Sequence, residues 1–147
     1  MSKTLVICHV VFCTKHREPT IDPCYKRNLY AFLFKIFKDN KCWVYRMNGM
    51  EDHIHILFDL HPTISLSVLM KEIKAVSSQW LNKNPDFRFF RGWGKGYFAV
   101  SVSPEVKENV INYIISQETH HSKGDYRAEI ENLIHQYGME WYPDEWN

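Results

Sequence analysis

The chain has 147 residues, a length that fits a single domain over residues 1–147. Hydrophobic residues make up 45% of it and aromatic residues 15%, which excludes a disordered chain. Lys and Arg number 18 against 17 Asp and Glu, so overall charge does not indicate a nucleic-acid binder, and any such surface must be a local patch.

Strand-like and helix-like stretches alternate along the chain. Runs rich in β-branched and aromatic residues predict strands, and apolar residues at helical spacing predict helices. In chain order the predicted elements are a strand at 4–14, a helix at 22–39, strands at 42–47 and 53–60, a helix at 65–81, a strand at 97–102, and helices at 103–119 and 126–137.

Turn residues punctuate this pattern. Asp22 and Pro23 have the chemistry of an N-cap followed by the first helical position, so they predict the start of the first helix. Asn48-Gly49 is a strong hairpin signal and predicts the turn between the second and third strands.

The order of elements predicts an α+β fold of the ferredoxin-like (RRM-like) type. In this fold a split βαβ arrangement forms an antiparallel sheet with helices on one face. The helix at 103–119 is then an added C-terminal helix that carries the candidate catalytic residue described below. Residues 121–147 are expected to form a further helix and tail that pack on the core or on a dimer partner.

Compartment is predicted from cysteine usage and from the hydropathy pattern. No apolar run approaches the roughly 20 residues of a membrane span, and the first residues lack a signal-peptide pattern. The four cysteines form no CxxC pair, and free thiols are usual in the cytoplasm. We therefore expect a cytoplasmic protein with no membrane partner.

Two histidines stand out in the third predicted strand. Side chains alternate faces along a strand, so His53 and His55 project from one face, while Ile54 and Ile56 suit the core on the other. Two imidazoles one strand period apart can share a metal ion. Two surface histidines on a half-exposed strand would show the same pattern, so the pair needs partners elsewhere in the chain.

The helix at 103–119 offers such partners. Tyr113 and Gln117 are four residues apart and therefore share a helix face, although each alone is compatible with an ordinary helix position. Together with His53 and His55 they form a set suited to metal-assisted phosphodiester cleavage. The two imidazoles and the Gln117 carbonyl oxygen would be ligands of Mg²⁺ or Mn²⁺, and Tyr113 would be the nucleophile.

At this point the chain resembles the single-tyrosine transposases of bacterial insertion sequences, which belong to the HUH endonuclease superfamily and include relatives associated with REP sequences. The resemblance runs from about residue 6 to residue 121 and rests on ordered blocks rather than on any single motif. These blocks are residues 11–17, 51–57, 74–80, 93–102 and 113–121. One departure is Glu51, where a proline would be expected before Asp-His.

The resemblance implies a specific activity. Such enzymes cut single-stranded DNA at the ends of a mobile element, form a 5′-phosphotyrosine intermediate and rejoin strands with a divalent metal ion and no ATP. They recognise DNA hairpins near those ends and act as homodimers, in which active sites can be shared between subunits. On this match Tyr113 is the catalytic nucleophile, and His53, His55 and Gln117 are the metal ligands.

Candidate DNA-binding residues are cations that lie near aromatic side chains or at strand ends. Phosphate contacts and base stacking from such stretches are typical of surfaces that track a single strand. The candidates are Lys15, Arg17, Lys74 and Arg91.

Other functions remain as alternatives. A non-catalytic module that binds single-stranded nucleic acid would share the fold, but it leaves His53, His55, Tyr113 and Gln117 without a role. A domesticated, repeat-associated nickase would keep the chemistry without a mobile element. A histidine-triad nucleotide hydrolase would need a third histidine at the position of Leu57.

Overall fold

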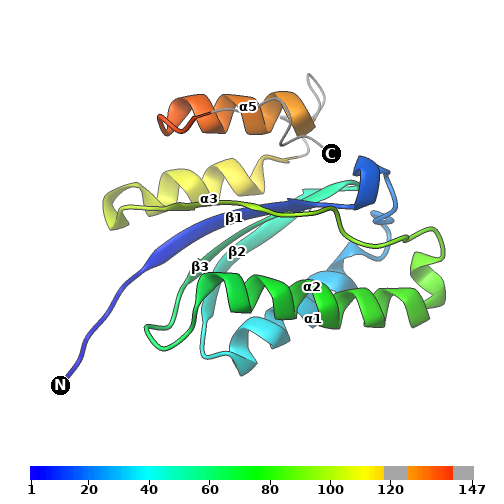
Figure 1. Cartoon of the computed structure of the whole chain (residues 1–147), viewed down its shortest axis with the longest axis horizontal. Coiled ribbons are helices and arrows are strands. Elements are labelled where there is room, and N and C mark those ends of the chain that lie inside the picture. The colour runs from blue at the N-terminus through cyan, green and yellow to red at the C-terminus, as the bar shows by residue number, and fades with distance from the viewer. Residues whose placement is uncertain (118–125, 141–147) are drawn as a thin grey trace.

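The computed structural model describes residues 1–117 and 126–140 (Figure 1). It contains a four-stranded antiparallel sheet in the order β2-β3-β1-β4, which confirms the predicted ferredoxin-like arrangement. The elements are β1 (Ile7–Cys13), α1 (Lys26–Asp39), β2 (Trp43–Met50), β3 (His53–Asp59), α2 (Leu66–Lys83), β4 (Phe98–Ser101), α3 (Lys107–Ile115) and α5 (Tyr126–Gln136), with short 3-10 helices at Lys15–Arg17, Pro85–Phe87 and Pro104–Val106.

Helices cover both faces of the sheet. Figure 1 shows α1 and α2 on one side, and α3 and α5 on the other. Alternate residues of β1 and β3, such as Phe12 and Ile54, pack against α1 and α2 in the main core. The opposite face is buried by α3 and α5, which pack on Leu57 and Val11 respectively. None of the described helices is long and apolar enough to cross a membrane.

The predicted turn at Asn48-Gly49 is wrong. Both residues lie within β2, where Gly49 pairs with Ile54, and the turn of the hairpin is formed three residues later by Glu51 and Asp52. Tertiary contacts explain the difference, because the Asn48 side-chain amide donates to the carbonyl oxygens at the end of α3, at 3.1 and 3.2 Å. The asparagine therefore joins the sheet to α3 instead of forming the turn.

Two helix boundaries also differ from the sequence prediction. The first helix begins at Lys26 because Asp22 Oδ1 accepts a hydrogen bond from the backbone N–H of Cys24, at 2.9 Å, in a turn that precedes the helix. Regular helix α3 begins at Lys107, after a 3-10 helix, and ends at Ile115. The predicted residues of this helix beyond 117 lie outside the described part of the chain.

Gly49 is required by a close backbone approach. A Cβ atom at this position would overlap the carbonyl oxygen of His53 and lie 2.9 Å from Cα of Ile54. Gly49→Ala should therefore lower the free energy of unfolding by about 2 kcal/mol or more. Urea denaturation measures this change. Gly138→Ala is the matched control, because its Cβ meets open space and only the left-handed φ of 69° opposes it.

Candidate active site

The two histidines of β3 lie on the sheet face that α3 and α5 cover. Both side chains are fully buried, whereas Ile54 and Ile56 point into the main core on the opposite face. The predicted alternation is confirmed, and the alternative of two surface histidines is wrong.

Each imidazole is oriented by a hydrogen bond to its Nδ1 atom. Asp52 Oδ1 lies 2.6 Å from His53 Nδ1, and His9 Nε2 lies 2.9 Å from His55 Nδ1. Such partners fix the ring and direct the other nitrogen, Nε2, toward a metal ion. Both Nε2 atoms here face a carboxylate of α5, Glu129.

The surroundings shift the pKa values of His53 and His9 in opposite directions. Burial by itself lowers the pKa of His53, but hydrogen bonds from its ring to the Asp52 and Glu129 carboxylates, together with their negative charge, outweigh burial and raise the pKa to about 9. Burial, together with neighbouring His55, lowers the pKa of His9 to about 3. A neutral His9 can accept the Nδ1–H of His55, which leaves the Nε2 lone pair of His55 available to an ion.

Helix α3 and the residues just after it bring the predicted tyrosine and glutamine to the histidines. The Tyr113 ring meets the His55 ring edge-on with centroids 5.7 Å apart. Gln117 is fully buried, and its Oε1 lies 3.2 Å from His53 Nε2. The regular helix ends before Gln117, yet the chain still turns this amide toward the site. All four residues that were predicted to act together are therefore close together within one chain.

Glu129 completes the group and was not predicted. Its Oε1 lies 3.0 Å from His55 Nε2, and its Oε2 lies 3.4 Å from His53 Nε2. Gln117 Nε2 donates to Oε1 at 3.0 Å, and the Tyr113 hydroxyl donates to the same oxygen. Burial and the neighbouring carboxylate raise the pKa of Tyr113 above its usual value, so the phenol is protonated in this state.

The donor atoms fit a divalent cation. One nitrogen each of His53 and His55 and one carboxylate oxygen of Glu129 all lie within 4.8 Å of one another. The amide oxygen of Gln117 lies beside the same His53 nitrogen. A set of two imidazoles with oxygen ligands accommodates Mg²⁺ or Mn²⁺.

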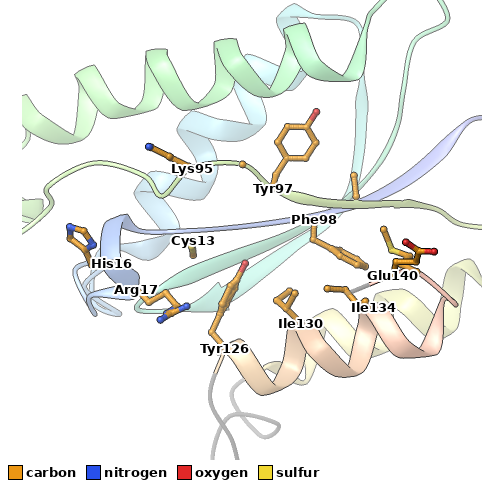
Figure 2. A pocket seen from close by; sticks show the side chains of 13 residues that line it. Cys13, His16, Arg17, Lys95, Tyr97, Phe98, Tyr126, Ile130, Ile134 and Glu140 are labelled. Atoms are coloured by element: carbon orange, nitrogen blue, oxygen red, sulfur yellow. The ribbon is translucent and has the colours of Figure 1, made fainter. Parts of the chain in front are cut away.

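A pocket of about 470 Å³ opens next to this site. It lies between α5, the Lys15–Arg17 turn and the segment that leads into β4 (Figure 2). Phe98 lies next to Ile130 and Ile134 in the pocket wall, and Arg17 lies beside Tyr126. The Tyr126 ring lies 4.8 Å from the His53 ring, so the pocket adjoins the metal-ligand cluster.

The four predicted DNA-binding cations lie in different settings. Arg17 lines the pocket, and Lys15 is an exposed residue of the same turn. Lys74 Nζ donates to the carbonyl oxygens of Gly94, at 2.9 Å, and Gly96, so it fastens the segment before β4. Arg91 donates to two backbone carbonyl oxygens of its own loop.

The two aromatic residues near this segment, Trp93 and Tyr97, also lie in different settings. Trp93 packs on the main core, and its indole N–H donates to Ser77 Oγ at 2.9 Å. Tyr97 is exposed and lines the pocket, so it is the better placed of the two for a stacking contact.

The ferredoxin-like sheet, its buried histidine pair and the adjacent tyrosine form the arrangement expected of an HUH-type tyrosine transposase. The family model for "Transposase IS200 like" matches residues 2–117, and the chain belongs to this family. It is therefore an enzyme, and its helix α5 lies beyond the matched residues.

Solved structures support the fold. The chain is similar to a protein assigned as a transposase from Deinococcus radiodurans R1, with 20% identity over 79% of this chain and 93% of the other and a TM-score of 0.59. It is also similar to a REP-associated tyrosine transposase bound to a REP hairpin, with 15% identity over 82% and 74% of the two chains and a TM-score of 0.60. No curated protein matches the chain.

Proposed function

We propose that this transposase cleaves and rejoins single-stranded DNA by a metal-dependent reaction in which Tyr113 is the nucleophile. The observation that carries the proposal is the meeting of four side chains in one chain. Tyr113 lies edge-on to His55, and Gln117 Oε1 lies 3.2 Å from His53 Nε2. A nucleophile beside a candidate cation site is what phosphodiester cleavage requires.

His53, His55 and the Gln117 amide oxygen would hold the cation, which when bound supplies Lewis-acid stabilisation of the scissile phosphate. The Tyr113 oxygen attacks the phosphorus, and the bond from phosphorus to the 3′ oxygen breaks. The leaving 3′ oxygen takes up a proton from solvent, so the products are a 5′-phosphotyrosine and a free 3′-hydroxyl. Glu129 Oε1, which accepts the Tyr113 hydroxyl, is placed to take its proton. Attack by a 3′-hydroxyl reverses the step, so rejoining requires no ATP.

The pocket favours an unpaired strand as substrate. Its aromatic and apolar walls adjoin the buried histidines, so a base must leave the duplex stack to enter it. The relative that is bound to a REP hairpin supports a substrate with hairpins at the element ends. We also propose that the protein acts as a homodimer in the cytoplasm. The closeness of Tyr113 to His55 within one chain favours an active site formed in cis.

A covalent-adduct assay tests the proposal. The native flanks of the gene are supplied as separate single strands with a label at the 3′ end, together with Mn²⁺ or Mg²⁺. The label should move with the protein on a denaturing gel and should disappear when a chelator is present. Tight hairpin binding without an adduct would instead support the non-catalytic binding module, and equal cutting of duplex DNA would contradict the class of substrate.

Of the four predicted DNA-binding cations, Arg17 is the one that lines the pocket, where it lies beside Tyr126. Arg17→Ala should weaken single-strand binding about three- to tenfold and reduce the salt dependence by about one phosphate. Fluorescence anisotropy at several salt concentrations measures both quantities. Lys38→Ala is the control, since this exposed lysine lies on α1, across the sheet. If the two substitutions had equal effects, the proposed contact between Arg17 and DNA would be contradicted.

A further inference from the structure

Helix α5 lies outside the residues that match the family model, yet it brings a carboxylate into the candidate active site. The matched residues end at 117, and α5 begins at Tyr126. Its Glu129 is nevertheless largely buried, with a side-chain exposure of 10%, and contacts both histidines, Gln117 and Tyr113. A charged group buried to this extent needs compensating partners.

Three distances within this cluster are compatible with ligands that share one ion. Donor atoms about 2.1 Å from a shared cation lie about 3.0 Å apart at adjacent octahedral positions and about 3.4 Å apart in a tetrahedron. The observed separations are 3.0 Å from Glu129 Oε1 to His55 Nε2 and 3.4 Å from Oε2 to His53 Nε2. Gln117 Oε1 lies 3.2 Å from His53 Nε2. All three values fall in the expected interval.

Two further features favour a ligand. Asp52 and His9 hold the outer nitrogens of the two histidines, so both inner nitrogens are directed toward Glu129. Imidazoles and an amide oxygen that act as metal ligands carry no net charge, whereas a carboxylate provides the negative oxygen that Mg²⁺ and Mn²⁺ favour.

Packing makes α5 a firm support for this carboxylate. Tyr126, Ile130 and Leu133 are buried against Val11 and Phe98 of the sheet. Glu129 immediately precedes one of these anchors and is therefore placed by the same contacts. Ligands on a packed helix are held more accurately than ligands on a loop.

We propose that Glu129 is a fourth protein ligand of the divalent cation, so that α5 is part of the metal site. This inference rests on the proposed function only for the presence of the cation. Glu129 would add a negatively charged oxygen ligand to the imidazoles of His53 and His55 and the amide oxygen of Gln117.

The contacts of Glu129 also suggest a rival role. Because its carboxylate touches both the Tyr113 hydroxyl and the histidine nitrogens, it could stand where the scissile phosphate binds. It would then compete with DNA instead of binding the ion. The two roles predict different results for Mn²⁺ binding, since removing a ligand weakens that binding and removing a competitor of DNA leaves it unchanged.

Calorimetric titration of the full chain with Mn²⁺, without DNA, separates these roles. Glu129→Gln keeps the shape and removes the charge, and Glu129→Ala removes the whole carboxylate. Both should raise the Kd for Mn²⁺ at least tenfold, by analogy with the 10- to 100-fold cost of losing a supporting partner of a ligand. The matched control is Glu131→Gln, because Glu131 lies on the same helix and pairs with Arg127 outside the site. Circular dichroism melts confirm that each variant is folded.

Titration of His55→Ala beside these variants distinguishes failure of the Glu129 proposal from failure of the proposed metal site as a whole. Weaker binding in both Glu129 variants and in His55→Ala, with Glu131→Gln unchanged, supports the proposal. Weaker binding in His55→Ala alone overturns it and leaves the proposed function standing, and a simultaneous rise in adduct formation would assign Glu129 to the place of the phosphate. No Mn²⁺ binding by the native chain would overturn both the inference and the metal-dependent mechanism.

Discussion

Tyr113→Phe should reduce covalent-adduct formation and strand cleavage by at least about a thousandfold, because it removes the nucleophilic oxygen. The phenyl ring keeps the edge-on contacts with His9 and His55, so the fold should be preserved. Hairpin binding should change less than about twofold, since the substitution removes one hydroxyl group and no positive charge. The gel assay with 3′-labelled single strands measures the adduct, and anisotropy measures binding.

Tyr25→Phe is the matched control for this experiment. Tyr25 precedes α1, and its ring meets Phe87 on the opposite side of the sheet from the active site. The control should retain full adduct formation. If Tyr113→Phe still formed an adduct on the same strand, another residue would be the nucleophile and the assignment would be wrong.

The second large effect is expected from His53→Ala, which should abolish the stabilisation that the cation gives to the folded chain. A ligand at a hundredfold excess over its Kd stabilises a protein by about 2.7 kcal/mol. The native chain should gain about this amount from Mn²⁺ at that excess, whereas the variant should gain nearly nothing. Thermal and urea denaturation with and without Mn²⁺ measure the difference. Strand cleavage should fall at least about a hundredfold.

His61→Ala is the control, because it removes an imidazole that lies outside the proposed metal site. His61 lies just beyond β3, where its Nδ1 contacts the backbone and hydroxyl of Thr63. Its variant should respond to Mn²⁺ as the native chain does. A His53→Ala protein that is already unfolded without metal would show that His53 serves the core instead, because it is fully buried.

Much of the site could be predicted because its residues follow local periodicities. The two-residue period of a strand places His53 and His55 on one face, and the structure shows them there. The spacing of Tyr113 and Gln117 likewise predicts a shared helix face. Both reach the histidines, although the regular helix ends at Ile115. Such relations depend on backbone geometry over a few residues, which a sequence encodes directly.

Errors arose where a distant segment overrides a local signal. Asn48-Gly49 has ideal turn chemistry, but the Asn48 amide bonds to carbonyls of α3, and β2 continues to Met50. The contacts of Lys74 were likewise not predicted, because its ammonium group bonds to carbonyl oxygens of the segment before β4. In each case the decisive partner lies far away in the sequence.

Glu129 shows the same limit most clearly. The only sequence signal is that it flanks an apolar helix face formed by Tyr126, Ile130 and Leu133. Many solvated helix positions share that pattern. Its contact with the histidines depends on how α5 packs across β1 and β4, and no short-range pattern specifies that docking.

Local periodicity was therefore enough to establish the order of strands and helices, the face of β3 that carries the histidines, and the pairing of Tyr113 with Gln117. The tertiary structure alone decided that α5 covers this face, that Glu129 enters the ligand cluster and that a pocket opens beside it. The physical reason is that backbone geometry acts between neighbouring residues, whereas the docking of α5 is set by apolar burial against strands far away in the chain.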